Sequence, residues 1–211
     1  MEGKITGTNY AVISGIATTD LLNDRTVYRK NHYVLNIKVK RLSGETDIIP
    51  VIIPEKLVTD VTDYKGQYIC AVGHYHSKNR RDKQKRRLKL YVYASDLKVK
   101  ADYDKGIDNN YIFLDGYLCK EPIYRKTPLG RTITDLLVAV NSPDGRSDYI
   151  PCICWGRTAH LAASLPVGFH VGIKGRIQSR EYEKRISDKE SEKRIAYEVS
   201  VSKLVIKNEG D

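Results

Sequence analysis

Residues 9–15 read "NYAVISG" and residues 110–116 read "NYIFLDG", an offset of 101 positions. With one residue added, "GQYICAVGHYHS" (66–77) aligns with "GFHVGIKGRIQS" (168–179). Three further positions are identical at the first offset: Gly44 and Gly145, Asp47 and Asp148, and Pro50 and Pro151. A period of about 100 residues is too long for a stacked solenoid unit of roughly 20–50 residues, so it indicates a duplicated domain.

Each copy has the hydrophobic pattern of short β-strands. In "HYVLNIKVKRL" (32–42) apolar and polar residues alternate as in a half-buried strand, and "LSGETD" (42–47) is typical of a turn. The strands expected are "NYAVISGIA", "HYVLNIKVKRL", "IIPVIIP", "YICAVGHYHS" and "RLKLYVYASDL", then "YIFLDGYL", "TITDLLVAV", "DYIPCICW", "FHVGIKGRIQSR" and "AYEVSVSKLVI". Apolar spacing predicts a short helix over residues 55–64 in the first copy and over 157–165 in the second.

Five strands with a helix between the third and fourth is the element order of the OB-fold, a five-stranded Greek-key barrel that binds oligonucleotides. We therefore expect an all-β protein with two tandem OB-folds. Residues 1–101 form the first domain, strongly basic, and residues 110–211 form the second. The polar, glycine-containing stretch 102–109 is the expected linker.

The charge is uneven along the chain. The net charge is +10, and residues 1–105 hold 20 Lys and Arg against 12 Asp and Glu. A basic surface attracts polyanions, of which nucleic acid is the commonest in the cytosol. A merely soluble basic protein is the alternative interpretation.

The expected location is the cytoplasm, in association with the nucleoid. No stretch reaches the roughly 20 apolar residues of a membrane span, and the first residues do not resemble a signal peptide. Cys70, Cys119, Cys152 and Cys154 have no disulfide-framework spacing, so we expect reduced cysteines and no membrane partner.

The strand "DYIPCICW" (148–155) carries the clearest candidate site. Because side chains alternate along a strand, Tyr149 and Trp155 share one face, while Ile150, Cys152 and Cys154 suit a core. Exposed aromatic rings stack on bases with roughly 1–3 kcal/mol each and with little regard for sequence. The alternative is that Trp155 is simply buried.

Basic residues near these strands are candidates for phosphate contacts, which release counterions and weaken with salt. "KNRRDKQKRRLK" (78–89), eight basic residues in twelve, is expected as the loop between the last two strands of the first copy. A solvated charge run is the alternative. The basic candidates are Lys174, Arg176, Arg180 and Arg131 in the second copy, and Arg80, Arg81, Lys83, Lys85, Arg86 and Arg87 in the first. A bulge near Gly175 would alter which of them share a face.

No enzyme signature is present: there is no glycine-rich phosphate loop, no nucleophile elbow and no paired His/Glu zinc motif. His74 and His76 share a strand face, but no third metal ligand is evident. The stretch 102–113 begins like a calcium loop yet has Ile107 and Phe113 where glycine and glutamate are required. We expect no enzymatic activity, no cofactor, no metal and no small-molecule substrate.

Residues 110–206 resemble the bacterial single-stranded DNA-binding proteins, and residues 9–99 match more loosely as a diverged copy. The resemblance rests on the opening Asn-strand-Gly and on "TPLG" (127–130), "AVN" (139–141), "WGR" (155–157) and "GRIQSREY" (175–182). It implies sequence-independent binding and protection of single-stranded DNA in replication, recombination or repair. The family's base-stacking aromatics fall on Tyr149, Trp155 and Tyr182, whereas the first copy has Ile48, Pro54 and Arg80. The first copy would then act by charge or in assembly.

The resemblance also bears on partners. Family members usually carry one OB domain and form tetramers, so it implies a homodimer with four OB-folds. The family's usual acidic tip is not seen after "LVIKNEGD" (204–211), which suggests an accessory, phage or mobile-element protein, or a relative of primosomal replication protein N. Two alternatives stay open: a primosome or recombination adaptor that acts through protein–protein contacts, and an RNA-binding OB protein.

Overall fold

The structure is a computed structural model that describes residues 7–23, 32–60, 63–82, 85–100, 109–142, 145–185 and 191–207. We call residues 7–100 the first half and residues 109–207 the second half. Within these ranges twelve strands form one sheet, and the prediction of an all-β protein is confirmed. No helix in the described ranges is long and apolar enough to cross a bilayer.

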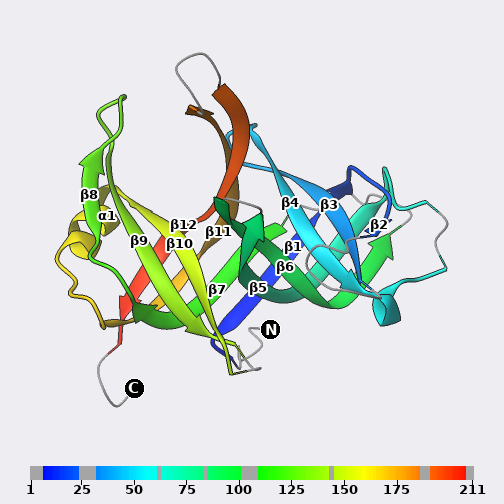
Figure 1. Cartoon of the computed structure of the whole chain (residues 1–211), viewed down its shortest axis with the longest axis horizontal. Helices are drawn as coiled ribbons and strands as arrows, with labels where there is room; N and C mark the ends of the chain where they lie inside the picture. Colours follow the sequence, from blue (N-terminus) through cyan, green and yellow to red (C-terminus); the bar gives the residue numbers. More distant parts are fainter. Residues whose placement is uncertain are drawn as a thin grey trace.

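The first half contains β1 (Asn9–Ala17), β2 (Leu22–Asn23), β3 (His32–Lys40), β4 (Thr46–Pro54), the 3-10 helix η1 (Glu55–Leu57), β5 (Tyr68–Asp82) and β6 (Lys85–Lys100). The second half contains β7 (Asn109–Leu118), β8 (Ile123–Lys126), β9 (Thr132–Asn141), β10 (Ser147–Trp155), α1 (Gly156–Ala163), β11 (His170–Arg185) and β12 (Ser191–Ile206). Figure 1 shows the two halves side by side.

The strand pairing closes a ring in each half. In the first half the ring runs β1–β3–β4–β6–β5 and back to β1, and β4–β6 is the parallel pair. In the second half it runs β7–β9–β10–β12–β11 and back to β7, and β10–β12 is the parallel pair. A closed ring of short strands buries one face of each strand in the core and leaves the other face for contacts.

The repeated asparagines and glycines of the sequence have structural causes. Asn9 and Asn110 each bind a backbone amide and carbonyl, of Tyr75 on β5 and of Ile177 on β11 respectively. A Cβ on Gly175 would lie 2.3 Å from the backbone oxygen of Ser200, a distance that real Cβ atoms do not show. These residues therefore fix where the fourth strand of each ring bends.

The helices differ from the sequence prediction. In the second half α1 covers Gly156–Ala163, close to the expected 157–165, although Leu161 is exposed. In the first half the prediction of a helix over 55–64 is wrong, because η1 ends at Leu57 and Val58 is already extended. Among the described residues of this segment, Tyr64 is buried in the core, and Leu57 and Val58 are partly buried against it.

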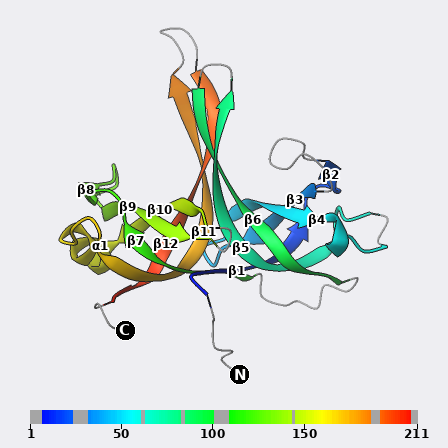
Figure 2. The ribbon, with the colours of Figure 1, turned by 60° about the horizontal axis from the view of Figure 1, so that its bottom comes forward.

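The two halves meet along β1 and β7, which pair antiparallel with Asn9 opposite Leu114 and Ile13 opposite Asn110. The repeat offset exchanges these two pairs, so the backbone at this seam has an approximate two-fold relation. The hairpins β5–β6 and β11–β12 extend past the rings and lie next to each other, on the same side of the molecule (Figure 2).

Candidate nucleic-acid interface

The two faces of β10 have the expected difference in exposure. Tyr149 is 46% exposed and Trp155 is 36% exposed, whereas Cys152 and Cys154 are buried. Burial raises the pKa of the Cys154 thiol to about 12, as suits an unreactive core cysteine. The alternative in which Trp155 is a core residue is therefore wrong. Ile153 departs from the simple pattern, because it is buried on the same face as the two aromatics.

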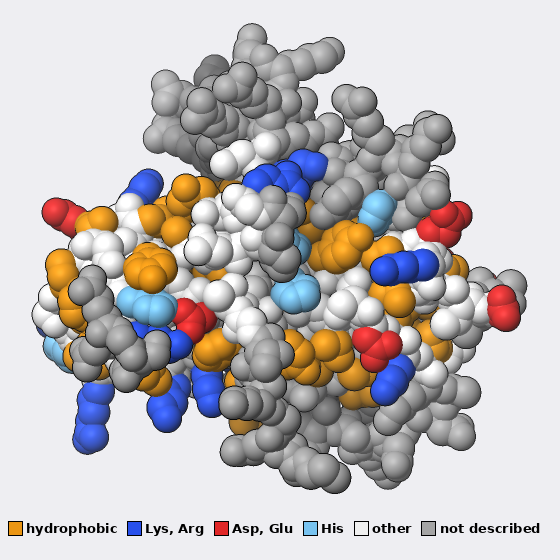
Figure 3. Space-filling model, turned by 90° about the horizontal axis from the view of Figure 1, so that it is seen from below, with side chains coloured by type: hydrophobic (Ala, Val, Ile, Leu, Met, Phe, Trp, Pro, Cys, Tyr) orange, Lys and Arg blue, Asp and Glu red, His pale blue; other side chains and the backbone are white. Residues whose placement is uncertain are grey.

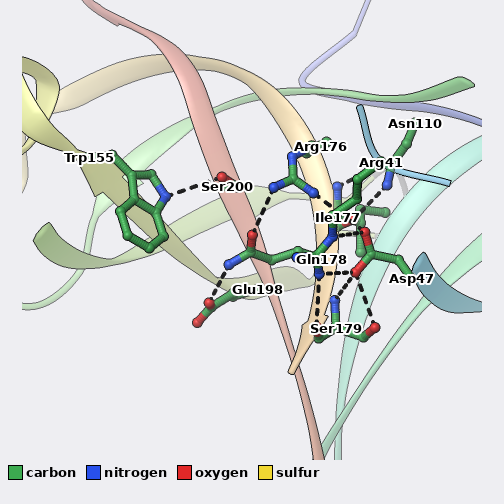
Figure 4. Close-up of polar contacts among 10 residues, drawn as sticks. All are labelled: Arg41, Asp47, Asn110, Trp155, Arg176, Ile177, Gln178, Ser179, Glu198 and Ser200. Atoms are coloured by element: carbon green, nitrogen blue, oxygen red, sulfur yellow. Dashed lines mark hydrogen bonds and ion pairs between the residues drawn. The ribbon is translucent and has the colours of Figure 1, made fainter. Parts of the chain in front are cut away.

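The indole of Trp155 is held by the neighbouring strand. Its Nε1 donates to Oγ of Ser200 on β12, at 3.2 Å. Ser200 lies opposite Arg176 of β11 in the antiparallel register, so the indole, the hydroxyl and the guanidinium follow one another across the outer face of the sheet (Figure 4). The hydrogen bond satisfies the polar edge of a ring that is 36% exposed.

A polar network continues the row from Arg176. Its Nη2 donates to Oε1 of Gln178 at 3.3 Å, and Nε2 of Gln178 donates to Oε1 of Glu198 at 2.6 Å. Burial and then the positive charge of Arg41 lower the pKa of the Arg176 guanidinium, which stays charged at neutral pH. This network holds one positive group in a defined place beside the indole.

The first half contributes a buried carboxylate to this network. Asp47 accepts from Nε of Arg41 at 2.7 Å, from the backbone amide of Ser179 at 2.7 Å, and from Nη1 of Arg176 at 3.4 Å. Burial alone would raise the pKa of Asp47, but the hydrogen bonds from Arg41 and from the Ser179 amide outweigh it and lower the pKa. Sequence reasoning missed this role, although the matching pair Asp47 and Asp148 was its visible signal.

Tyr182 and Arg180 lie further along β11, on the projecting hairpin. The guanidinium carbon of Arg180 lies 5.9 Å from the centre of the Tyr182 ring, which is within the range of a cation–π contact. Tyr182, Tyr197 and Pro151 line one pocket of about 670 Å³, and Leu88 of the first half also borders it. The structure thus brings Tyr182 together with the outer face of β10.

The remaining basic candidates of the second half lie outside this row. The register of β11 against β12 shifts between Lys174 and Gly175, and Lys174 is exposed. Arg131 is exposed and lies two residues before Ile133, which pairs with Trp155. Within the described ranges, the indole of Trp155 donates its hydrogen bond to Ser200 and forms none with either basic residue. Lys174 and Arg131 therefore stay predictions as phosphate-binding residues.

The basic run of the first half is strand rather than loop. β5 continues to Asp82 and β6 begins at Lys85, with Arg80 opposite Arg87 and Arg81 opposite Arg86. Lys83, and the side chains of Arg80, Arg81, Lys85, Arg86 and Arg87, lie outside what the structure describes.

In the first half, Ile48 stands at the position of Tyr149 and Pro54 at the position of Trp155, and neither is aromatic. Ile48 is exposed and Pro54 is buried. His74 and His76 gain no third metal ligand, because no three such side chains gather among the described residues.

Comparison with known proteins places these features in context. A family model described as "Single-strand binding protein family" matches residues 109–206. Among curated relatives, the single-stranded DNA-binding protein of Oceanobacillus iheyensis is 37% identical over 81 residues, which cover 35% of this chain and 50% of that protein. Single-stranded DNA-binding protein B of Bacillus subtilis is 37% identical over 81 residues, which cover 35% of this chain and 72% of that protein. For most of the first few relatives, the match spans about half of their length.

A solved structure matches nearly the whole chain. The wild-type single-stranded DNA binding protein from Thermus aquaticus aligns with a TM-score of 0.74 and 20% identity, covering 98% of this chain and 96% of that one. A deletion variant of the same protein gives a TM-score of 0.73 at 21% identity. At such identity the likeness establishes the fold, which is all-β and of the OB type.

Proposed function

Because this chain belongs to the single-strand binding protein family, we propose that it binds single-stranded DNA with little regard to sequence. Tyr149, Trp155 and Tyr182 stack on bases, and lysine and arginine side chains contact phosphates. The expectation that the chain is not an enzyme agrees with this family, whose members bind DNA without catalysing a reaction.

The observation that carries the proposal is the placement of Trp155. The ring is exposed on an outer sheet face, its edge is held by Ser200 of β12, and the charged guanidinium of Arg176 lies on β11, on the far side of β12. A stacking surface beside a fixed cation matches the two chemical parts of a nucleotide, the base and the phosphate. Nothing in this arrangement distinguishes one base from another by hydrogen bonding.

The architecture we propose is two tandem OB-folds, over residues 1–101 and 110–211, joined by residues 102–109. The equivalent rings of five strands support this division. By analogy with one-domain family members that form tetramers, two such chains assemble into a homodimer of four OB-folds. Protection of single strands in replication, recombination or repair is the corresponding cellular role.

Tryptophan fluorescence tests the proposal directly. The chain has one tryptophan, so all indole emission reports on Trp155. Adding oligo-dT at low salt should quench this emission until saturation, oligo-dA and oligo-dC should act similarly, and added salt should reverse the effect. Duplex DNA of equal length is the control and should quench little. Constant emission at saturating oligo-dT would contradict stacking by Trp155 and would favour an adaptor that acts through protein contacts.

A further inference from the structure

A second pocket lies where β5 and β6 of the first half meet the second half. Its volume is about 580 Å³, a usual size for a ligand pocket. Its lining includes His74, His76, Lys78, Tyr91 and Tyr93 of the first half, and Arg146 of the second. Near the middle of the face in Figure 3, histidine and hydrophobic side chains lie next to one another.

This pocket occupies the position in the first half that the polar network next to Trp155 occupies in the second. His74 pairs across the strands with Tyr93, as Arg176 pairs with Ser200. The next cross-strand pair outward is His76 with Tyr91, which corresponds to Gln178 with Glu198. An offset of 102 residues relates β5 to β11 in these pairs, and an offset of 107 relates β6 to β12, so rings replace the polar network of the second half.

The rings are ordered by their own contacts. Nε2 of His32 lies 3.1 Å from the hydroxyl of Tyr93, and the ring of His76 meets that of Tyr93 edge-on at 6.1 Å. Ile52 and Tyr91 form a small apolar cluster separate from the main core, against which Tyr93 packs. Such a preformed apolar floor loses little conformational entropy when a flat ring settles on it.

The opposite wall supplies polar groups and positive charge. Asp148 accepts from the Ser77 amide at 2.6 Å and lies 2.8 Å from Nδ1 of His76, which fixes the imidazole. Lys78 and Arg146 bring cationic side chains to the same pocket from the two halves. Burial, and then the nearby imidazole of His76, lower the pKa of His74, which favours the neutral form of this ring for contact with a base.

We infer that this pocket binds a nucleotide unit of the same DNA strand, with the base against Tyr93 and the imidazoles and the phosphate near Lys78 and Arg146. The inference rests on the proposed function, since it continues the strand from Trp155 onto the first half. It differs from the expectation that the first half acts mainly by charge or serves assembly. The aromatics have moved from the third strand to the fourth and fifth, where a comparison of family positions does not find them.

Moving the single tryptophan into the pocket tests this inference separately from the proposed function. The wild type is titrated first, because quenching of Trp155 establishes DNA binding by itself. The double variant Trp155→Phe, Tyr93→Trp then carries its only indole in the pocket. Oligo-dT that saturates the wild type should quench this indole as well. Quenching in the wild type but not in the double variant would overturn the inference and leave the proposed function standing.

Free thymidine monophosphate distinguishes the source of the nucleotide. It should quench the introduced indole only weakly at concentrations where oligo-dT saturates. Equal quenching by the monomer would overturn the assignment to a bound strand and indicate a free-nucleotide site.

Charge variants give a second readout that does not depend on tolerance of the larger ring. Lys78→Gln and Arg146→Gln should each weaken oligo-dT binding by about threefold to tenfold and lower its salt dependence. Lys65→Gln is the matched control, since Lys65 is exposed in the turn before β5 and outside the pocket. If both pocket variants bind like the Lys65 control, the pocket does not contact the strand.

Discussion

Asp148 in the second half accepts a hydrogen bond from the backbone amide of Ser77 in the first, with 2.6 Å between nitrogen and oxygen. The reciprocal contact joins Asp47 to the amide of Ser179 at 2.7 Å. Each half therefore places a carboxylate at the base of the other half's long hairpin. The DNA-binding residues proposed on these hairpins, Arg176 and His76, contact the same two carboxylates. The positions of the two candidate sites thus depend on contacts between the halves.

Replacing Trp155 by alanine should weaken oligo-dT binding by about 1–3 kcal/mol, because the protein then stacks on one base fewer. The melting temperature should change little, since the indole is 36% exposed and belongs to no core cluster. Trp155→Phe is the matched control and should retain much of the affinity. Fluorescence anisotropy of a labelled oligonucleotide measures both variants. A collapse in melting temperature for Trp155→Ala would show that the ring supports the fold.

Asp47 should make stability depend on pH in the acid range. Its folded-state pKa lies below the usual value of 3.8, so its contribution is complete above that value and is lost as the pH falls through the folded pKa. Asp47→Asn should lower the free energy of unfolding at neutral pH by about 1–3 kcal/mol and flatten the acid limb. Urea unfolding across the pH range measures this.

The control for this prediction is Asp135→Asn, which breaks the solvent-accessible ion pair with Arg125 and should cost under about 1 kcal/mol. Equal losses for the two variants would mean that the buried position of Asp47 contributes nothing special.

The arginines of the first hairpin should govern the salt dependence of binding. Arg80 lies opposite Arg87 and Arg81 lies opposite Arg86 in the backbone register of this hairpin. Arginines that neutralise phosphates release counterions, which makes affinity fall as salt rises. Reversing Arg86 and Arg87 to glutamate should therefore lower the slope of log affinity against log salt by about 0.7 for each phosphate that the variant no longer neutralises. An unchanged slope would mean that this hairpin does not contact the strand.

Tyr75→Phe should stabilise the protein by up to about 1–3 kcal/mol, the cost of leaving a buried hydroxyl unpaired. The Tyr75 hydroxyl is fully buried and has no hydrogen-bond partner within the described ranges. The matched change is Tyr64→Phe, which should destabilise, because the Tyr64 hydroxyl accepts from the Thr59 amide at 2.9 Å. Thermal unfolding compares the two, and destabilisation by both would contradict the assignment of an unsatisfied group at Tyr75.

The sequence predicted the strands and the exposed face of β10 because strand alternation is a local property that each segment displays by itself. The segment 55–64 misled because apolar residues in an irregular loop can share helical spacing by packing on a core. The charged run 78–89 was predicted as a loop because it lacks apolar alternation, but a projecting hairpin can form strands without an apolar face. The roles of Asp47, Tyr91 and Tyr93 were hidden because they depend on which strands become neighbours and on where the halves meet.

The antiparallel contact of β1 with β7 relates the two backbones by rotation, but the side chains on either side of it are different. A polynucleotide has chemically distinct 5′ and 3′ ends. Two identical halves would accept it equally well in either orientation. Because Trp155 and Arg176 lie in the second half while Tyr93 and two imidazoles lie in the first, we expect the two orientations of a bound strand to differ in energy, which would give the strand a preferred direction across the protein.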